Sequence, residues 1–162
     1  MDYLWTPWRY RYISQAGEPG ECVFCAAANA SADDRELLVV HRARHNYVIL
    51  NRFPYTSGHV MVVPYCHVAT LEDLADEALV ELIRLARDTV KRLRKVYQPD
   101  GLNLGMNIGK SAGAGIAGHL HLHALPRWHG DVNFMTVVGE TRVVPEDLET
   151  TWERLRAAFA EE

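Results

Sequence analysis

The sequence contains few cysteines, three in 162 residues. An odd number of so few cysteines does not suit a disulfide framework and is typical of a protein from a reducing compartment. No run of apolar residues approaches the eighteen needed to span a membrane, and the first twenty residues lack the apolar segment of a secretion signal. We therefore expect a cytoplasmic protein that has no membrane partner.

The sequence also lacks a strong excess of charge of one sign, since its formal net charge is −4. Dedicated nucleic-acid-binding proteins are usually strongly basic. The densest group of basic residues lies in the second half of a predicted helix over 76–97, where the helix dipole favours cations. We interpret this group as a solvated helix face, in which Asp88 and Arg92 are spaced to pair, and we predict no nucleic-acid partner.

Internal repeats, Ser/Gly linkers and low-complexity segments are absent as well. A chain of 162 residues with 48% hydrophobic residues is long enough to form one domain with a substantial core. We expect a single domain over 1–162. It would include an N-terminal arm, 1–21, that is rich in Trp and Tyr, and a C-terminal extension, 136–162, made of a strand and a helix.

Hydrophobic periodicity predicts both strands and helices, and therefore an α+β protein. Asp76 is the expected N-cap of the long helix, and Pro145 lies near the start of the last one. The predicted strands cover 37–41, 47–51, 59–64, 102–108 and 119–126, and the predicted helices cover 23–30, 76–97 and a segment from Leu148 to Phe159.

Three histidines, His119, His121 and His123, alternate with apolar residues at the period of a β-strand. In a strand their imidazoles would share one face, about 7 Å apart. Imidazole can act near neutral pH as a nucleophile, a proton donor or a metal ligand, so the row predicts a functional site. The opposite face would place three residues in the core: Leu120, Leu122 and Ala124.

Glycines are concentrated immediately before this row, with five of them between Gly105 and Gly118. Glycine allows backbone N–H groups to approach an anion closely, so the segment predicts a phosphate-binding loop beside a nucleophilic histidine. A flexible hairpin connection is the alternative. The loop is not a P-loop, because no glycine stands five residues before the Gly109 that precedes Lys110.

The segment from His119 to Leu125 resembles the signature of the histidine triad family of nucleotidyl hydrolases and transferases at every position. The resemblance extends to 51–60, which is similar to the family's nucleoside-binding strand and turn, and to 102–109, which is similar to the strand that enters its phosphate loop. Flanking segments are most similar to the branch of diadenosine tetraphosphate phosphorylases: 4–9, 126–128 and 133–145.

The resemblance implies an antiparallel sheet of about five strands with two main helices, and a homodimer with a continuous sheet. It also implies catalytic roles for four histidines. His121 would attack an α-phosphorus while a carbonyl group fixes its tautomer, and His123 would contact the phosphate and the leaving oxygen. His119 is the first histidine of the triad, and His59 matches a further histidine near the phosphates.

The resemblance implies nucleotide-binding positions too. Asn51 would hold the ribose hydroxyls, Ile49 would lie near the base, and Asn107 would contact the phosphate. Gly113, Gly115 and Ile116 would form the phosphate loop. Many hydrolases of the family carry glutamine at the position of Gly115, followed by Ser or Thr. The absence of these amide and hydroxyl side chains at Gly115 and Ile116 leaves room for inorganic phosphate as an acceptor.

Cys22 and Cys25 have the two-residue spacing by which cysteines bind one metal ion. A redox pair or two buried thiols are the alternatives. The resemblance implies that His67 and His119 complete a structural zinc site, with Cys66 outside it.

From these features we expect an enzyme that cleaves diadenosine tetraphosphate into ATP and ADP through an adenylyl-His121 intermediate, with inorganic phosphate as acceptor. The first alternative is a hydrolase of dinucleoside polyphosphates or nucleoside phosphoramidates with the same intermediate. The second is a nucleotide-binding regulator with little turnover.

Overall fold

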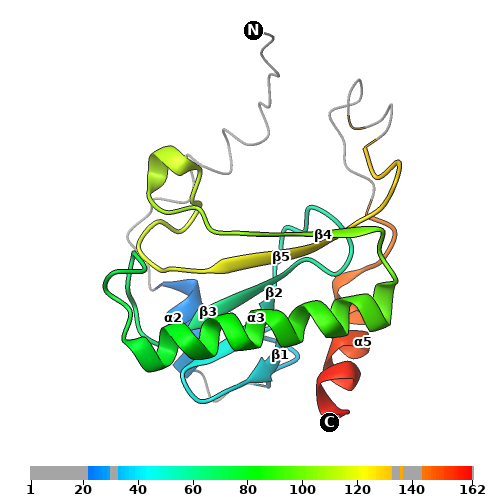
Figure 1. Cartoon of the computed structure of the whole chain (residues 1–162). Helices are drawn as coiled ribbons and strands as arrows, with labels where there is room; N and C mark the ends of the chain where they lie inside the picture. Colours follow the sequence, from blue (N-terminus) through cyan, green and yellow to red (C-terminus); the bar gives the residue numbers. More distant parts are fainter. Residues whose placement is uncertain (1–21, 30–32, 133–135, 137–143, 162) are drawn as a thin grey trace, which may run out of the picture.

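Five antiparallel strands form one sheet in the order β1-β2-β3-β5-β4 (Figure 1). The computed structural model describes residues 22–29, 33–132, 136 and 144–161. The predicted α+β class and sheet are confirmed. The strands are β1 (Val39–Arg42), β2 (Asn46–Leu50), β3 (Val60–Pro64), β4 (Gly101–Gly105) and β5 (Leu122–Arg127).

Within the described residues, three α-helices and one short 3-10 helix accompany the sheet, and α3 has the bounds that its apolar period predicts. The N-cap of α3 is Ala75 rather than Asp76, whose carboxylate lies in the first turn, where the helix dipole favours it. Asp147 caps α5 by accepting a hydrogen bond from the Thr150 N–H. The helices are α2 (Val23–Asn29), α3 (Asp76–Tyr97), η1 (Lys110–Ala112) and α5 (Leu148–Ala160).

The two faces of the sheet pack against different helices (Figure 1). One face packs against α3 and α5, and its core includes the three residues predicted from the histidine row: Leu120, Leu122 and Ala124. The other face packs against α2, where Phe24 lies over Ile49, Met61 and their neighbours. Because side chains alternate across a strand, the row places its histidines on the α2 face.

Two strands are shorter than predicted where they approach the histidine row. β5 begins at Leu122 rather than at 119, because Leu120 donates its N–H to the Val68 carbonyl and so leaves the ladder. β4 ends at Gly105 rather than at 108: its last pair is Gly105 with His123, and β5 has only one residue, Leu122, before that pair. β4 is therefore shorter than predicted because β5 begins later than predicted.

Other local predictions also differ from the structure. β1 begins at Val39 rather than at 37, because Leu38 has a φ of 62°, which is incompatible with a strand. The Asp88 carboxylate pairs with Arg87 and Lys91 instead of Arg92. The Arg92 guanidinium lies over the Phe159 ring and donates to the Asp88 carbonyl, so it is turned away from the carboxylate.

The predicted N-terminal arm, 1–21, and most of 133–143 lie outside the described residues. Among the helices that the structure does describe, none combines the length and apolar character that a membrane crossing requires.

Candidate active site

His121 lies just before β5, with its ring against Phe24 and its Nδ1 atom 2.8 Å from the carbonyl oxygen of His119. A carbonyl oxygen can only accept a hydrogen bond, so Nδ1 carries the proton. The lone pair of the neutral ring is therefore on Nε2. This is the carbonyl contact and the tautomer that the sequence analysis expects for a nucleophilic histidine.

His123 and His59 are joined in a directed chain of hydrogen bonds. The Tyr55 N–H donates to His59 Nδ1 at 3.1 Å, so the proton of the neutral His59 ring is on Nε2. His59 Nε2 lies 2.9 Å from His123 Nδ1 and donates to it. The proton of neutral His123 is consequently on Nε2, the atom that remains for a ligand.

Burial keeps the two triad rings neutral. Desolvation lowers the pKa of His121, although the hydrogen bond to the His119 carbonyl opposes this effect. Desolvation, with a smaller contribution from His121, lowers the pKa of His123 to about 4. The two ring centroids lie 4.9 Å apart. At neutral pH the site therefore offers one ring nitrogen with a free lone pair and a neighbouring ring N–H.

A pocket of about 210 Å³ opens beside His123 on the face of β4 and β5. Asn107, predicted to contact phosphate, is one of its lining residues. The full lining is Tyr55, Asn103, Leu104, Gly105, Met106, Asn107, His123 and Leu125. The pocket combines an aromatic ring and apolar side chains with amide and imidazole groups, as small-molecule sites do.

The other predicted nucleotide-binding residues lie nearby but outside this pocket lining. Asn51 follows β2, and its Nδ2 atom lies 3.4 Å from both ring nitrogens of His59, while its Oδ1 accepts the Phe53 N–H. Ile49 is buried under α2 in the apolar cluster of Phe24, against which Ile116 packs.

The glycine loop has backbone conformations that explain part of its composition. Gly109 and Gly113 have φ angles of 83° and 92°, which disfavour residues with a Cβ atom. They bracket η1, where the Gly113 N–H closes the turn onto the Lys110 carbonyl. Gly115 does not have a positive φ. A backbone requirement of this kind therefore does not account for glycine at that position.

Cys22, Cys25, His67 and His119 come together at the start of α2, and one ligand atom of each lies within 4.8 Å of the others. Cys25 Sγ lies 3.2 Å from His67 Nδ1 and 3.5 Å from His119 Nδ1, and Cys22 Sγ lies 3.4 Å from His119 Nδ1. Tetrahedral zinc with ordinary bond lengths separates sulfur and nitrogen ligands by about 3.6 Å.

The tautomer of His119 also suits a metal ligand. Its Nε2 lies 2.9 Å from the Pro64 carbonyl and must donate, so the lone pair is on Nδ1, among the thiols. Cys66 is exposed and outside this group. The donor set and its spacing therefore fit a zinc ion.

Two residues of the site were not identified from the sequence. Tyr55, whose N–H orients His59, lies in the segment 51–60 that is expected to bind the nucleoside, but a backbone donor leaves no signature in a sequence. Asn103 precedes Asn107 by four residues, an even spacing that places both on one face of a continuing strand. This spacing was the available signal.

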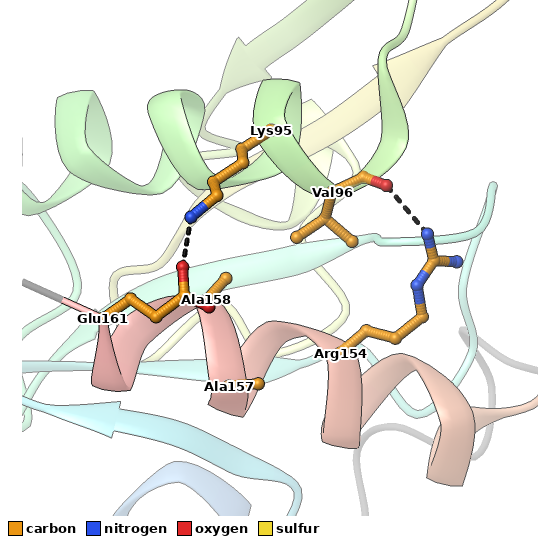
Figure 2. Close-up of a pocket in the computed structure, with 6 residues that line it drawn as sticks. All are labelled: Lys95, Val96, Arg154, Ala157, Ala158 and Glu161. Carbon is orange, nitrogen blue, oxygen red and sulfur yellow. Dashed lines mark hydrogen bonds and ion pairs between the residues drawn. The ribbon is translucent and has the colours of Figure 1, made fainter.

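A second hollow, of about 250 Å³, lies between α3 and α5, far along the chain from the histidine row (Figure 2). Lys95 and Glu161 form an ion pair across it, and Arg154 donates to the Val96 carbonyl at 2.8 Å. Its charged groups thus have partners within the protein, and its lining contains no histidine or cysteine.

Comparison with known proteins agrees with this geometry. The model of the HIT domain family matches residues 34–130, which contain the whole histidine row and the glycine loop. The chain belongs to the histidine triad (HIT) family. The matched HIT domain includes every strand of the sheet and the long helix α3.

Relatives of this HIT protein extend the likeness beyond the domain. It is 39% identical over 166 aligned positions to a Mycobacterium tuberculosis protein named AP-4-A phosphorylase, with 99% of this chain and 85% of the relative covered. It is 29% identical to an uncharacterized HIT-like protein of Mycoplasma pneumoniae, covering 83% of this chain and 89% of that protein.

A solved structure supports the same fold. A zinc-bound histidine triad family protein from Mycobacterium smegmatis superimposes with a TM-score of 0.70 and 31% identity. The match covers 87% of this chain and 94% of that protein.

Proposed function

We propose that this HIT protein is a nucleotidyltransferase that cleaves diadenosine tetraphosphate into ATP and ADP, with inorganic phosphate as acceptor. The observation that carries the proposal is the His121 ring, whose Nδ1–H is held by the His119 carbonyl at 2.8 Å and whose Nε2 therefore has a free lone pair. The identity of the substrate is supported by the 39% identical relative named AP-4-A phosphorylase.

The proposed reaction has two displacements. His121 Nε2 attacks the α-phosphorus of one adenosine, an N–P bond forms, and the P–O bond to the remaining triphosphate breaks to release ATP. An oxygen of inorganic phosphate then attacks the same phosphorus, the N–P bond breaks, and ADP leaves. His121 ends in its starting tautomer, because Nδ1 keeps its proton throughout.

Other residues would hold the reacting groups. His123 would donate its Nε2–H to a phosphate oxygen, with its tautomer set by His59, and Asn107 would contact the same phosphate. Backbone N–H groups of the loop from Gly113 to Ile116 would stabilise the developing negative charge. We place the base near Ile49 and the ribose hydroxyls near Asn51, as the family resemblance implies.

We also propose a zinc ion held by Cys22, Cys25, His67 and His119, whose ligand atoms have the required spacing. When bound, zinc would act as a structural cross-link. The four residues themselves join α2 to the loop after β3 and to the segment before β5. Since the His119 carbonyl orients His121, these ligands also position the nucleophile.

The assembly and compartment belong to the same proposal. A homodimer is supported by β4, which pairs with β5 on one side only in the described part of the chain. A reducing cytoplasm is supported by the small, odd number of cysteines, three in 162 residues.

The test is incubation with diadenosine tetraphosphate, with and without inorganic phosphate, followed by chromatography of the nucleotides. We expect ATP and ADP in equal amounts, formed only with phosphate. Equal turnover without phosphate, giving AMP and ATP, would assign a hydrolase instead. Nucleotide binding without turnover would assign the regulator and contradict the proposed chemistry.

A further inference from the structure

The pocket beside His123 contains an amide, Asn103, that the proposed chemistry does not use. We propose that Asn103, held by Arg127, binds a distal phosphate of the leaving polyphosphate and thereby sets the length of phosphate chain that the protein prefers. The inference rests on the proposed function, because it concerns the leaving group of that reaction.

Arg127 fixes the orientation of the Asn103 amide. Its guanidinium donates to both carboxylate oxygens of Asp131, at 2.6 and 2.8 Å, and through Nη1 to Asn103 Oδ1 at 3.0 Å. A guanidinium only donates hydrogen bonds, so the amide atom that faces it is the oxygen. The Nδ2 group of Asn103 is left as a donor for a ligand in the pocket that this residue lines.

The register of the sheet places this donor on the same face as His123, toward the far end of β5. Gly105 pairs with His123, and Asn103 lies two residues farther along β4 on the same face, opposite Leu125. Two residues of a strand correspond to about 7 Å. In the proposed subsite, the phosphate chain runs from the reacting phosphorus beside His123 along β4 and reaches Asn103 after a few phosphates.

The surroundings favour a negatively charged group. No lining residue of the pocket is acidic, and the carboxylate of Asp131, outside the lining, forms an ion pair with Arg127. The apolar side chain of Leu125, which lies opposite Asn103 on the same face, excludes water from part of the surface, which strengthens a hydrogen bond from the amide to a phosphate oxygen.

The test compares two substrates: diadenosine tetraphosphate and an adenylate ester whose leaving group has no phosphate. We expect Asn103→Ala to lower kcat/KM for the dinucleotide about tenfold, the usual effect of losing one hydrogen bond to a charged group, and to leave the ester within twofold. Asn103→Asp, which replaces the donor by a repelling carboxylate, should lower the dinucleotide rate further and also leave the ester unchanged.

The positioning role of Arg127 is tested through its coupling to Asn103. Arg127→Met should also lower only the dinucleotide rate, and the double variant with Asn103→Ala should lose no more than either single variant. Arg35→Met is the matched control, since Arg35 is similarly exposed and also pairs with acids, Glu149 and Glu153, away from the pocket. It should change neither rate.

Three outcomes would overturn the subsite. Equal losses on both substrates would mean that Asn103 only supports the fold. Asn103→Asp no worse than Asn103→Ala would identify the contact as a hydroxyl group rather than a phosphate. If the losses of kcat/KM in the two single variants add up in the double variant, Arg127 does not act through Asn103. Failure of the unaltered protein to turn over either substrate would instead overturn the proposed function itself.

Discussion

At the scale of single residues, the site is defined by where protons lie on its histidine rings. His121 and His119 each donate to a backbone carbonyl from one ring nitrogen, which leaves the other nitrogen free for phosphorus or metal. His59 Nδ1 instead accepts a hydrogen bond from a backbone N–H, so His59 donates from Nε2 to His123 Nδ1. The Nε2–H of His123 therefore remains as a donor to the pocket. The backbone thus assigns different chemistry to identical side chains.

Replacing the nucleophile tests this assignment most directly. We expect His121→Asn to lose several orders of magnitude in kcat while nucleotide binding, measured by calorimetry, is retained. His129→Asn is the control, because its side chain is 95% exposed and outside the triad, and it should keep full activity. A His121→Asn variant with a tenth of the original rate would rule out a covalent role for the ring.

The buried His123 ring should make stability depend on pH. Its pKa in the folded protein is about 4, below the ordinary value of 6.5, so between these values the unfolded chain binds more protons. Stability is therefore complete above pH 6.5 and falls as the pH is lowered toward 4. We expect His123→Asn to reduce the slope of the unfolding free energy against pH in this window by up to about 1.4 kcal/mol per pH unit. If the unfolding free energies of the two proteins, measured by denaturant titration at several pH values, change equally with pH, the prediction is wrong.

Gly115 is the residue on which the proposed choice of acceptor rests. It lacks a positive φ, so Gly115→Ala should fold with little loss, whereas Gly113→Ala, at a φ of 92°, should cost about 1 kcal/mol or more. We expect Gly115→Gln to lower the rate with phosphate and to raise the share of products formed with water, because the amide would fill the acceptor's space. An unchanged product ratio in both Gly115 variants would remove this residue from acceptor selection.

At the scale of elements, the sequence predicted periodic segments well and their ends less well. α3 has its predicted bounds because its apolar positions recur over six turns. The starts of β1 and β5 were wrong for reasons that are not periodic. Leu38 adopts a left-handed conformation, and Leu120 bonds to Val68 from a distant loop, which no local pattern encodes.

The candidate site was also predicted only in part. The histidine row and the glycine loop could be found because the chemistry requires those residue types at a fixed spacing. The hydrogen bonds of Tyr55 and Arg127 could not, since one uses the backbone and the other depends on the register between β4 and β5. Long-range pairing, rather than local preference, determines these parts of the site.

The cluster of candidate metal ligands depends on how the elements pack, because it brings α2 together with two distant segments. If zinc binds there, purified protein should contain about one zinc per chain, and a chelator should lower its Tm, since only the folded state holds the ligands together. Cys25→Ser should lower both values. Cys66→Ser should lower neither, because that thiol lies outside the cluster. Protein that is free of zinc after purification without chelators would exclude the site.

At the scale of the whole molecule, the larger apolar core and the candidate site lie on opposite faces of the sheet. The face under α3 and α5 carries the larger apolar core. Among the described residues, the short helix α2 covers the opposite face over β1, β2 and β3 and beside the first two triad histidines. Beyond α2, the same face forms the pocket of β4 and β5. Within the described residues, the histidines that we propose as catalytic thus lie where the buried start of β5 meets this pocket. Burial can therefore keep the imidazoles neutral beside a site that a ligand can enter.

The free edge of β4 makes the last prediction a test of assembly. Within the described residues this strand bonds only to β5, so its outer N–H and C=O groups are available to a second copy, which a two-fold axis would pair antiparallel into a continuous sheet. Leu104 on this strand is 47% exposed, an apolar surface that such pairing would cover. We expect Leu104→Asp to convert a dimer into a monomer in sedimentation velocity, because two buried carboxylates would face each other near the axis. Val23→Asp, at a 60% exposed valine on α2, should remain dimeric. A dimeric Leu104→Asp variant would place the interface away from the β4 edge.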